Sequence, residues 1–322
     1  MCFIKNRKKK MKEKLRSEYS RLLRPTDFPT MVESHKIVAD IGFAILKEHG
    51  KHGTKTSWDH DGNLLYQMTM LKSLSLTQHA TPLNHLNSID GSRLNDTFDP
   101  FAMASIVRSQ YEAFCNFNNI YIQSKSIDEL KLKYHLWVIS GLNYRQRFKA
   151  TTPAHVKKKE GEQKEIANLL ETIKANACFI QLDEQSQKNV FDGIKKKDWQ
   201  FKIDGVKASK IAWHEMMTNA GASDMLEGQY SSLSLNSHPS NVSVFQFGTM
   251  YIEGMQVFNT RMAIQLSKVF TAMFIRDYLV YFKEYQKYFE TFAPIPQMLI
   301  NTYNGMFRNE GYRLNDINNM LN

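Results

Sequence analysis

Two short polar stretches of this chain carry side chains that could do acid–base chemistry on an anionic substrate. Arg108 and Glu112 stand four residues apart in an aromatic segment, and Tyr230, Ser234 and His238 also step by four. Residues four apart lie on the same side of an α-helix, so each set is predicted to share one helix face. If the two helices pack together, a guanidinium, a carboxylate, two hydroxyls and an imidazole converge on one candidate catalytic site.

The residue types favour proton transfer beside a stabilised negative charge. Histidine has an unperturbed pKa of roughly 6.5, which suits a general acid or base near neutral pH. An arginine stabilises charge that develops on an oxygen atom in the transition state. Two simpler interpretations stay open: Arg108 and Glu112 form an ordinary intrahelical ion pair worth about 0.2–0.5 kcal/mol, and His238 caps its helix while Tyr230 and Ser234 hydrogen-bond to backbone groups.

Helical periodicity dominates the chain and predicts an all-α fold, a multi-helix bundle. Apolar side chains recur every three to four residues over the segments 99–123, 126–148 and 256–289. Asp99 and Ser126 are typical N-caps for the first two helices, which we expect to form an antiparallel pair. We expect all three helices to pack together as the core, with no sheet of three or more strands.

Shorter elements and three parts of the chain are also indicated. The expected shorter elements are a helix at 64–76, interrupted helix over 155–197, an extended connector at 199–204, short helices at 207–218 and 222–237, and a short helix within 301–322. The parts are a basic N-terminal extension, 1–24, a helical domain, 25–290, and an Asn-rich C-terminal tail, 291–322.

Positive charge is concentrated at the N-terminus. The chain has a formal net charge of +10, and residues 1–24 hold ten Lys or Arg against two Glu, which leaves +2 for the other 298 residues. Such a basic segment binds nucleic acid or an anionic membrane surface by releasing counterions. The candidate nucleic-acid contacts are Lys8, Lys9, Lys10 and Arg16. The alternative is a solvated terminal segment without a partner.

The sequence gives no support to several protein classes. The basic start lacks the apolar run of about 7–15 residues of a secretory signal, and no segment reaches the roughly 20 apolar residues of a membrane span. Three cysteines without metal-like spacing indicate a reduced, cytoplasmic protein. Motifs of hydrolases, NTPases and dehydrogenases are absent. The His and acidic residues within 49–61 and 213–215 lack the spacing of helical metal sites. We therefore expect neither a metal nor another cofactor.

At the candidate site residues the chain resembles a bacterial, all-helical family of unknown function. The pattern is an R-x-x-x-E helix followed by a late Y-x-x-L-S-x-x-x-H-P segment, and the resemblance covers about residues 30–285. The matching positions are Arg108, Glu112, Lys197, Asp198, Trp199, Tyr230, Leu233, Ser234, His238 and Pro239. That family is distantly similar to the HEPN superfamily, in which many members are metal-independent RNases of toxin–antitoxin and anti-phage systems.

The resemblance implies a HEPN-like RNase of stress or anti-phage defence, with RNA as its partner. HEPN proteins carry an Arg and a His about four to six residues apart on one helix, duplicated across a dimer, so a homo-oligomer is implied as well. This chain departs from that pattern, because no His follows Arg108 at that distance. In an RNase, Arg108 would stabilise the phosphate, His238 would act on the 2'-hydroxyl, and Glu112 and Tyr230 would orient them.

Two other functions stay open as alternatives. The same residues would form a buried structural network in a non-catalytic helical module that binds a protein or a nucleic acid. The aromatic helix could also line a pocket for a small ligand. The distance between the Arg108 guanidinium and the His238 imidazole is the observation that separates chemistry from a structural role.

Overall fold

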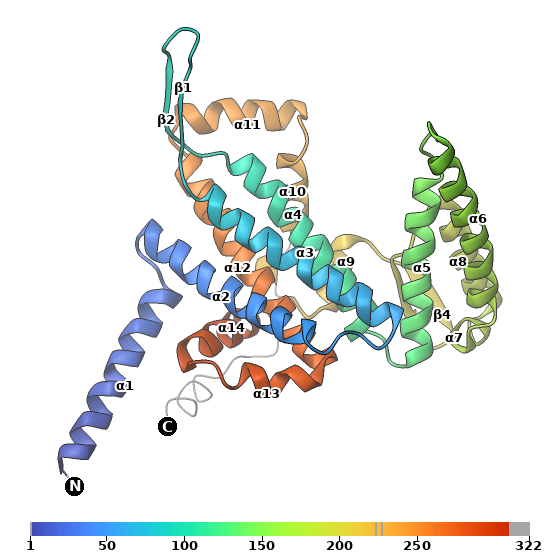
Figure 1. Cartoon of the computed structure of the whole chain (residues 1–322), viewed down its shortest axis with the longest axis horizontal. Coiled ribbons are helices and arrows are strands. Elements are labelled where there is room, and N and C mark those ends of the chain that lie inside the picture. The colour runs from blue at the N-terminus through green and yellow to red at the C-terminus, as the bar shows by residue number, and fades with distance from the viewer. Residues whose placement is uncertain (1, 223, 227, 309–322) are drawn as a thin grey trace. The chain divides into compact units, whose positions relative to one another are not determined.

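The computed structural model describes residues 2–222, 224–226 and 228–308, and the side chains from Lys9 onward. Within this part of the chain the elements are helices and two short β-hairpins, which confirms the all-α fold class (Figure 1). By packing, the chain divides into two units. Unit 1 comprises Met1–Cys115 and Gly221–Asn322, and unit 2 comprises Asn116–Ala220. The divisions near residues 24 and 290 that composition indicates do not coincide with these boundaries.

Unit 1 is built from helices of both ends of the chain and one β-hairpin. Its α-helices are α1 (Cys2–Leu23), α2 (Phe28–Gly50), α3 (Ser57–His79), α4 (Pro100–Phe117, which ends in unit 2), α10 (Gln229–Asn236), α11 (Asn241–Ile252), α12 (Gln256–Tyr281), α13 (Gln286–Phe289) and α14 (Pro294–Met306). Short 3-10 turns lie at Asp224–Leu226 and Lys283–Tyr285, and the hairpin strands are β1 (Leu83–Leu86) and β2 (Arg93–Thr97).

The long helix α12 is the central element of unit 1. It packs against α2, α3 and α14, so apolar side chains are buried around most of its circumference. Phe270, Phe274 and Tyr278 are fully buried, and the rings of Tyr111 and Phe114 in α4 contact Phe270 and Phe274 edge-on. Removing one such buried aromatic side chain typically costs about 3–5 kcal/mol. The packing on α12 therefore fixes α4, the helix that carries the first candidate stretch.

Helix α1 packs against the rest of unit 1 through its C-terminal part. Leu22 is 2% exposed, and the Tyr19 hydroxyl lies 2.6 Å from the Thr302 hydroxyl of α14. Arg21 donates to both carboxylate oxygens of Glu33 in α2, at 2.8 and 2.9 Å. The C-terminal part of the basic segment is therefore packed against other helices of unit 1. Lys9, Lys10 and Arg16 precede this packed part in the chain, and their side chains are exposed.

The β1–β2 hairpin was not predicted. Its strands pair antiparallel, and almost all of their residues are exposed, as the projecting loop in Figure 1 illustrates. Two hydrogen bonds hold its base to the helices that follow α10. The Tyr251 hydroxyl of α11 donates to the Phe98 carbonyl at 2.7 Å, and the Phe98 amide donates to Gln256 Oε1 at 2.8 Å.

Unit 2 packs α5 against a smaller set of helices and a second hairpin. Its elements are a π-helical turn (Asn118–Ile122), α5 (Ile127–Arg145), α6 (Pro153–Lys174), α7 (Ala177–Ile180), α8 (Glu184–Lys196), β3 (Phe201–Asp204), β4 (Lys207–Lys210) and α9 (Trp213–Asn219). The core combines Leu132 and Leu136 of α5 with Ile173 of α6, Val190 of α8 and Phe201 of β3. Unit 2 thus has an apolar core of its own.

Several boundaries differ from the sequence predictions. The expected single core of three helices is wrong, because α5 belongs to unit 2, whereas α12 belongs to unit 1. The helix predicted over 256–289 ends at Tyr281, where Phe282 leaves the helical conformation and packs its ring on His49 and Tyr278. The helix predicted to begin at 207 starts six residues later, because 207–210 pairs with β3 across a turn at Gly205, whose φ is +61°.

Two further predicted helices are also changed. The helix expected over 222–237 is confined to α10, after a 3-10 turn, and α11 follows it without having been predicted. The helix expected within 301–322 is α14, which begins earlier, at Pro294. Residues 309–322 of the Asn-rich tail lie outside the described residues.

Candidate functional site

Four of the predicted site residues meet at one point of unit 1, around the guanidinium of Arg108. Its Nε donates to Glu112 Oε1 at 3.0 Å, its Nη2 donates to the Tyr230 hydroxyl at 3.2 Å, and its Nη1 lies 2.9 Å from His238 Nε2. Tyr230 also donates to Glu112 Oε1 at 3.4 Å. The predicted convergence of Arg108, Glu112, Tyr230 and His238 is confirmed, and we call these four residues the Arg108 cluster.

Helix α4 carries Arg108 and Glu112 one turn apart, next to Tyr111, whose ring contacts Phe270 of α12. The helix starts at a side-chain cap, in which Asp99 Oδ1 accepts from the Ala102 amide at 3.0 Å. The side chains of Arg108 and Glu112 are 22% and 30% exposed. At this depth a charged group requires partners, and the i, i+4 ion pair provides the first of them.

Helix α10 places Tyr230 over Arg108. The Tyr230 ring lies 5.4 Å from the Tyr111 ring of α4, and the Arg108 guanidinium lies 5.4 Å from the Tyr230 ring centroid. Leu233 is the buried residue of α10 and anchors the same helix to the unit. Ring packing and the hydroxyl group therefore both hold Tyr230 in the cluster.

His238 reaches the cluster from a turn and not from the helix that carries Tyr230. Helix α10 ends at Asn236, because Pro239 disfavours helical conformation at the residue before it. The backbone carbonyl of His238 accepts from Ser243 Oγ at 2.6 Å and from the Ser240 amide at 2.7 Å. Ser240 is also the N-cap of α11. The start of α11 therefore fixes the His238 backbone, while the imidazole itself is exposed.

The contact with Arg108 fixes the role of His238 Nε2 as a hydrogen-bond acceptor. A guanidinium has only N–H donors and no acceptor, so His238 Nε2 must accept the hydrogen bond from Arg108 Nη1. A nitrogen that accepts carries no proton. The lone pair of His238 Nε2 is therefore directed at Arg108.

Burial and neighbouring charges shift the pKa values of both Tyr230 and Arg108. Burial raises the pKa of the Tyr230 hydroxyl, the Arg108 hydrogen bond lowers it, and the net change is upward. Tyr230 is therefore protonated at neutral pH and is able to donate to Glu112. For Arg108, burial lowers the guanidinium pKa, but the Tyr230 hydrogen bond and the Glu112 charge outweigh this and raise it.

Other predicted residues lie elsewhere. Ser234 lies on α10 and is half-buried, but within the described chain its side chain makes no hydrogen bond to the Arg108 cluster. Lys9, Lys10 and Arg16 are exposed on α1, and the side chain of Lys8 lies outside the described residues. Sequence reasoning also missed Ser243, although its position three residues after Ser240 is the spacing of a helix N-cap.

The His and acidic residues near positions 49–61 have structural contacts. The His49 ring stacks on Tyr285 and hydrogen-bonds Tyr278, and Asp59 accepts from the Tyr281 hydroxyl at 2.7 Å. Among the described residues, no group of three or more His, Cys, Asp or Glu side chains is arranged to hold a metal ion. In the same part of the chain, no helix has the length and apolar character needed to cross a bilayer.

Comparison of the chain with protein-family models, with curated proteins and with solved structures gave no match. The HEPN-like resemblance therefore stays a prediction that is based on the short motifs alone.

Proposed function

We propose that this chain is a metal-independent endoribonuclease in which Arg108 and His238 form the reactive pair. The hydrogen bond between them is the observation that carries the proposal. It joins a phosphate-binding group to an acid–base group at hydrogen-bond distance, and the imidazole is open to solvent. HEPN RNases also use an Arg and a His that lie close together. In this chain the two residues come from two separate chain segments.

In this geometry, the imidazole of His238 is held by Arg108. The His238 lone pair accepts from Arg108 Nη1 and is not available to a substrate proton. A phosphate oxygen that takes the Nη1 hydrogen replaces His238 as acceptor, because charge-assisted hydrogen bonds to an anion are the stronger ones. Binding of the phosphate thereby frees Nε2 of His238 beside the adjoining ribose.

The chemical step then follows from the positions of these groups. His238 Nε2 takes the proton of the 2'-hydroxyl, the 2'-oxygen bonds to phosphorus, and the bond from phosphorus to the 5'-oxygen breaks. The leaving oxygen takes a proton from water, and the products are a 2',3'-cyclic phosphate and a 5'-hydroxyl. Arg108 stabilises the added negative charge on the phosphate, and Glu112 and Tyr230 position Arg108. We place this activity in the cytoplasm, in stress or anti-phage defence.

RNA cleavage by the purified full-length chain tests the proposal. Single-stranded RNA and DNA of the same sequence would be incubated with the protein in the presence of a chelator, and the product ends analysed. We expect cleavage of RNA with 2',3'-cyclic phosphate ends and none of DNA, which lacks the 2'-hydroxyl. An intact RNA, or cleavage that stops on chelation, would contradict the proposal.

A second candidate is a non-catalytic binding module, and the surface of α11 favours it. Phe245 is 68% exposed and Ile252 is 87% exposed, and α11 buries only Ser243 and Met250. Exposed apolar groups gathered on one element mark interaction surfaces. In that case the Arg108 cluster would serve only to hold α4, α10 and the start of α11 together.

A further inference from the structure

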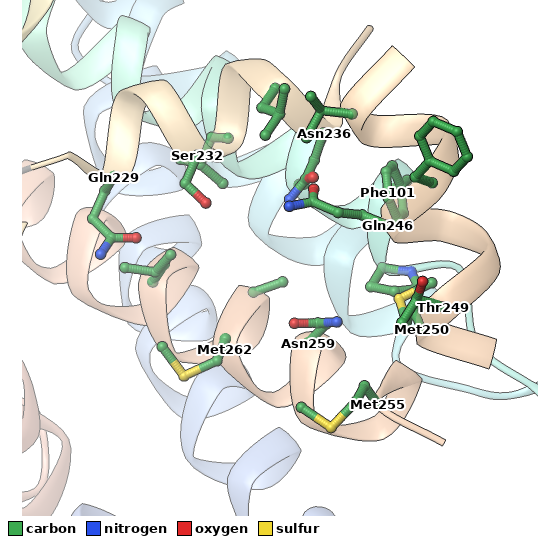
Figure 2. Close-up of a pocket in the computed structure, with 18 of the residues that line it drawn as sticks. Phe101, Gln229, Ser232, Asn236, Gln246, Thr249, Met250, Met255, Asn259 and Met262 are labelled. Atoms are coloured by element: carbon green, nitrogen blue, oxygen red, sulfur yellow. The ribbon is translucent and has the colours of Figure 1, made fainter. Parts of the chain in front are cut away.

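Beside the Arg108 cluster, unit 1 contains a cavity of ≈ 700 Å³ between the start of α4, α10, α11 and α12. This volume is within the range of about 300–1,000 Å³ that is typical of small-molecule sites. Figure 2 shows polar side chains from three helices around it, among them Ser232 and Asn236 of α10, Gln246 of α11 and Asn259 of α12. We call it the amide pocket.

The polar groups of the amide pocket are available to a ligand. Within the described part of the chain, the side chains of Ser232, Asn236, Gln246 and Asn259 form no hydrogen bond to other residues, whereas exposed amides elsewhere, such as Gln185, do. Each amide presents a donor and an acceptor side by side. Most of the remaining lining is apolar and includes Phe101, while Gln229, Thr249 and Glu253 add further polar groups.

The charge of the lining excludes an anionic group as the main occupant. Glu253 is the one ionisable residue among the lining residues, and no Lys, Arg or His is among them. An uncharged group with apolar faces and polar edges fits this lining. A nucleobase has this form, and Asn and Gln amides read base edges through paired hydrogen bonds, while aromatic side chains contact base faces.

The amide pocket shares lining residues with a cavity at the candidate active site. A second cavity, of ≈ 410 Å³, is lined by His238, Ser237 and Phe247, and it shares Phe101 and Asn236 with the amide pocket. The Phe101 and Phe247 rings contact each other edge-on with centroids 5.6 Å apart. A strand whose phosphate lies at Arg108 and His238 therefore has a cavity for a neighbouring base within the same unit.

We infer that the amide pocket binds one base of a single-stranded RNA substrate and sets the base preference of cleavage. This inference rests on the proposed endoribonuclease function. We expect Asn259 of α12 and Gln246 of α11 to discriminate between bases. Their amides line the same cavity as the polar groups of α10, so both can hydrogen-bond to the edge of one bound base.

Cleavage of RNAs that differ only in the base beside the cleaved phosphate tests the inference. We expect the wild-type chain to prefer one base by at least about fivefold, since a paired amide–base contact discriminates on that order. Asn259→Leu, which keeps the side-chain size, should reduce the preference to near one. Asn241→Leu, an exposed amide of α11 outside the pocket, should leave it unchanged. Cleavage with the same preference in wild type and Asn259→Leu would overturn the inference while leaving the RNase function intact.

Nucleoside binding separates the inference from the proposed function. Adenosine, guanosine, cytidine and uridine would be titrated into wild type and Asn259→Leu, with binding followed by saturation-transfer NMR. A nucleoside that binds the wild type and binds Asn259→Leu at least about fivefold more weakly supports the pocket even if no RNA is cleaved, an outcome that would reject the RNase alone. No binding of any of the four nucleosides would overturn the pocket inference.

Discussion

Arg108 donates a hydrogen bond to His238 across 130 residues of sequence, with 2.9 Å between Nη1 and Nε2. Because a guanidinium has only N–H donors, His238 Nε2 is the acceptor of this hydrogen bond, and its lone pair is directed at Arg108. In the proposed mechanism, this lone pair becomes available to a substrate proton when a phosphate oxygen replaces it as the acceptor. The contact is the basis of both the proposed mechanism and the predictions that concern the cluster.

The Tyr230 hydroxyl is predicted to stabilise unit 1 independently of any chemistry. Tyr230→Phe keeps the ring contact with Tyr111 but removes the acceptor of Arg108 Nη2 and the donor to Glu112. We expect the free energy of unfolding to fall by about 0.5–1.5 kcal/mol, measured by urea denaturation. Tyr144→Phe is the matched control, since Tyr144 is 47% exposed. Equal stabilities of the two variants would show that the hydroxyl contributes nothing.

Substitution by alanine at two helical glycines of unit 2 should change the free energy of unfolding in opposite directions. A Cβ at Gly193 would lie 2.6 Å from Cζ of the buried Phe201 ring, whereas a Cβ at Gly161 would meet nothing within 4 Å. Alanine favours a helix interior over glycine by about 0.8–1.0 kcal/mol. We expect Gly161→Ala to raise the free energy of unfolding and Gly193→Ala to lower it by about 1–3 kcal/mol through overpacking. A stabilised Gly193→Ala in urea melts would show that Phe201 moves aside freely.

Buried Lys268 is predicted to make stability depend on pH. Burial lowers its pKa to about 7, and its Nζ lies 3.3 Å from Ser34 Oγ and 4.5 Å from the Tyr303 ring centroid. In the unfolded chain the lysine pKa is about 10.4. Above pH 7 the unfolded state therefore binds more protons than the folded state, so the free energy of unfolding rises with pH, by at most about 1.4 kcal/mol per pH unit.

The neighbouring His35 contributes only a small part of this slope, and only near pH 7. Burial and then the Lys268 charge lower the pKa of His35 to about 3, so it stays neutral in the folded state above pH 7. Urea melts between pH 7 and about 8.5 should show the rise in wild type and in Lys188→Met, an exposed control, and lose it in Lys268→Met. A slope that persists in Lys268→Met would assign it to another group.

The basic part of α1 is predicted to bind RNA through phosphates. Residues 1–17 hold eight Lys or Arg and one Glu, and removing them keeps the packed residues Tyr19 and Leu22. We expect the truncated chain to bind single-stranded RNA more weakly. The slope of log affinity against log salt should flatten by about 0.7 for each phosphate that the truncated chain no longer neutralises, as measured by fluorescence titration at several salt concentrations. The full-length chain with Lys9, Lys10 and Arg16 changed to Gln should show part of the same effect, and an unchanged slope in both would place the RNA surface elsewhere.

The sequence predicted those features that depend on local periodicity. The long helices α4, α5 and α12 were found because each has a repeated apolar face, and Arg108 and Glu112 were recognised as an i, i+4 pair. Helix α11 was not predicted because it lacks such a repeated apolar face. Its apolar residues Val242, Val244, Phe245, Phe247 and Ile252 are distributed around the helix by their spacing, so no single apolar face marks it. The β1–β2 hairpin escaped because its strands of four and five residues are too short for alternation to identify, whereas the brief alternation at 199–204 indicated the extended segment that contains β3.

The site was found by residue type more than by geometry. The four-residue spacing predicts His238 on the same helix as Tyr230, but His238 belongs to the turn after α10, and its backbone is fixed by Ser240 and Ser243. Ser234, chosen by the same spacing, stays outside the Arg108 cluster. The division into two units was not predictable from the sequence pattern, because it depends on which distant segments pack together, and periodicity gives no information on that.

The effect of His238→Ala on RNA cleavage tests the central claim most directly. Loss of the base should reduce the cleavage rate of single-stranded RNA by about 10²–10⁴-fold, and the melting temperature should barely change because the imidazole is exposed. His85→Ala, an exposed histidine of the β1–β2 hairpin, should cleave at the wild-type rate. A His238→Ala variant that cleaves RNA as fast as His85→Ala, or that loses activity only together with its fold, would contradict the assignment of His238 as the catalytic base.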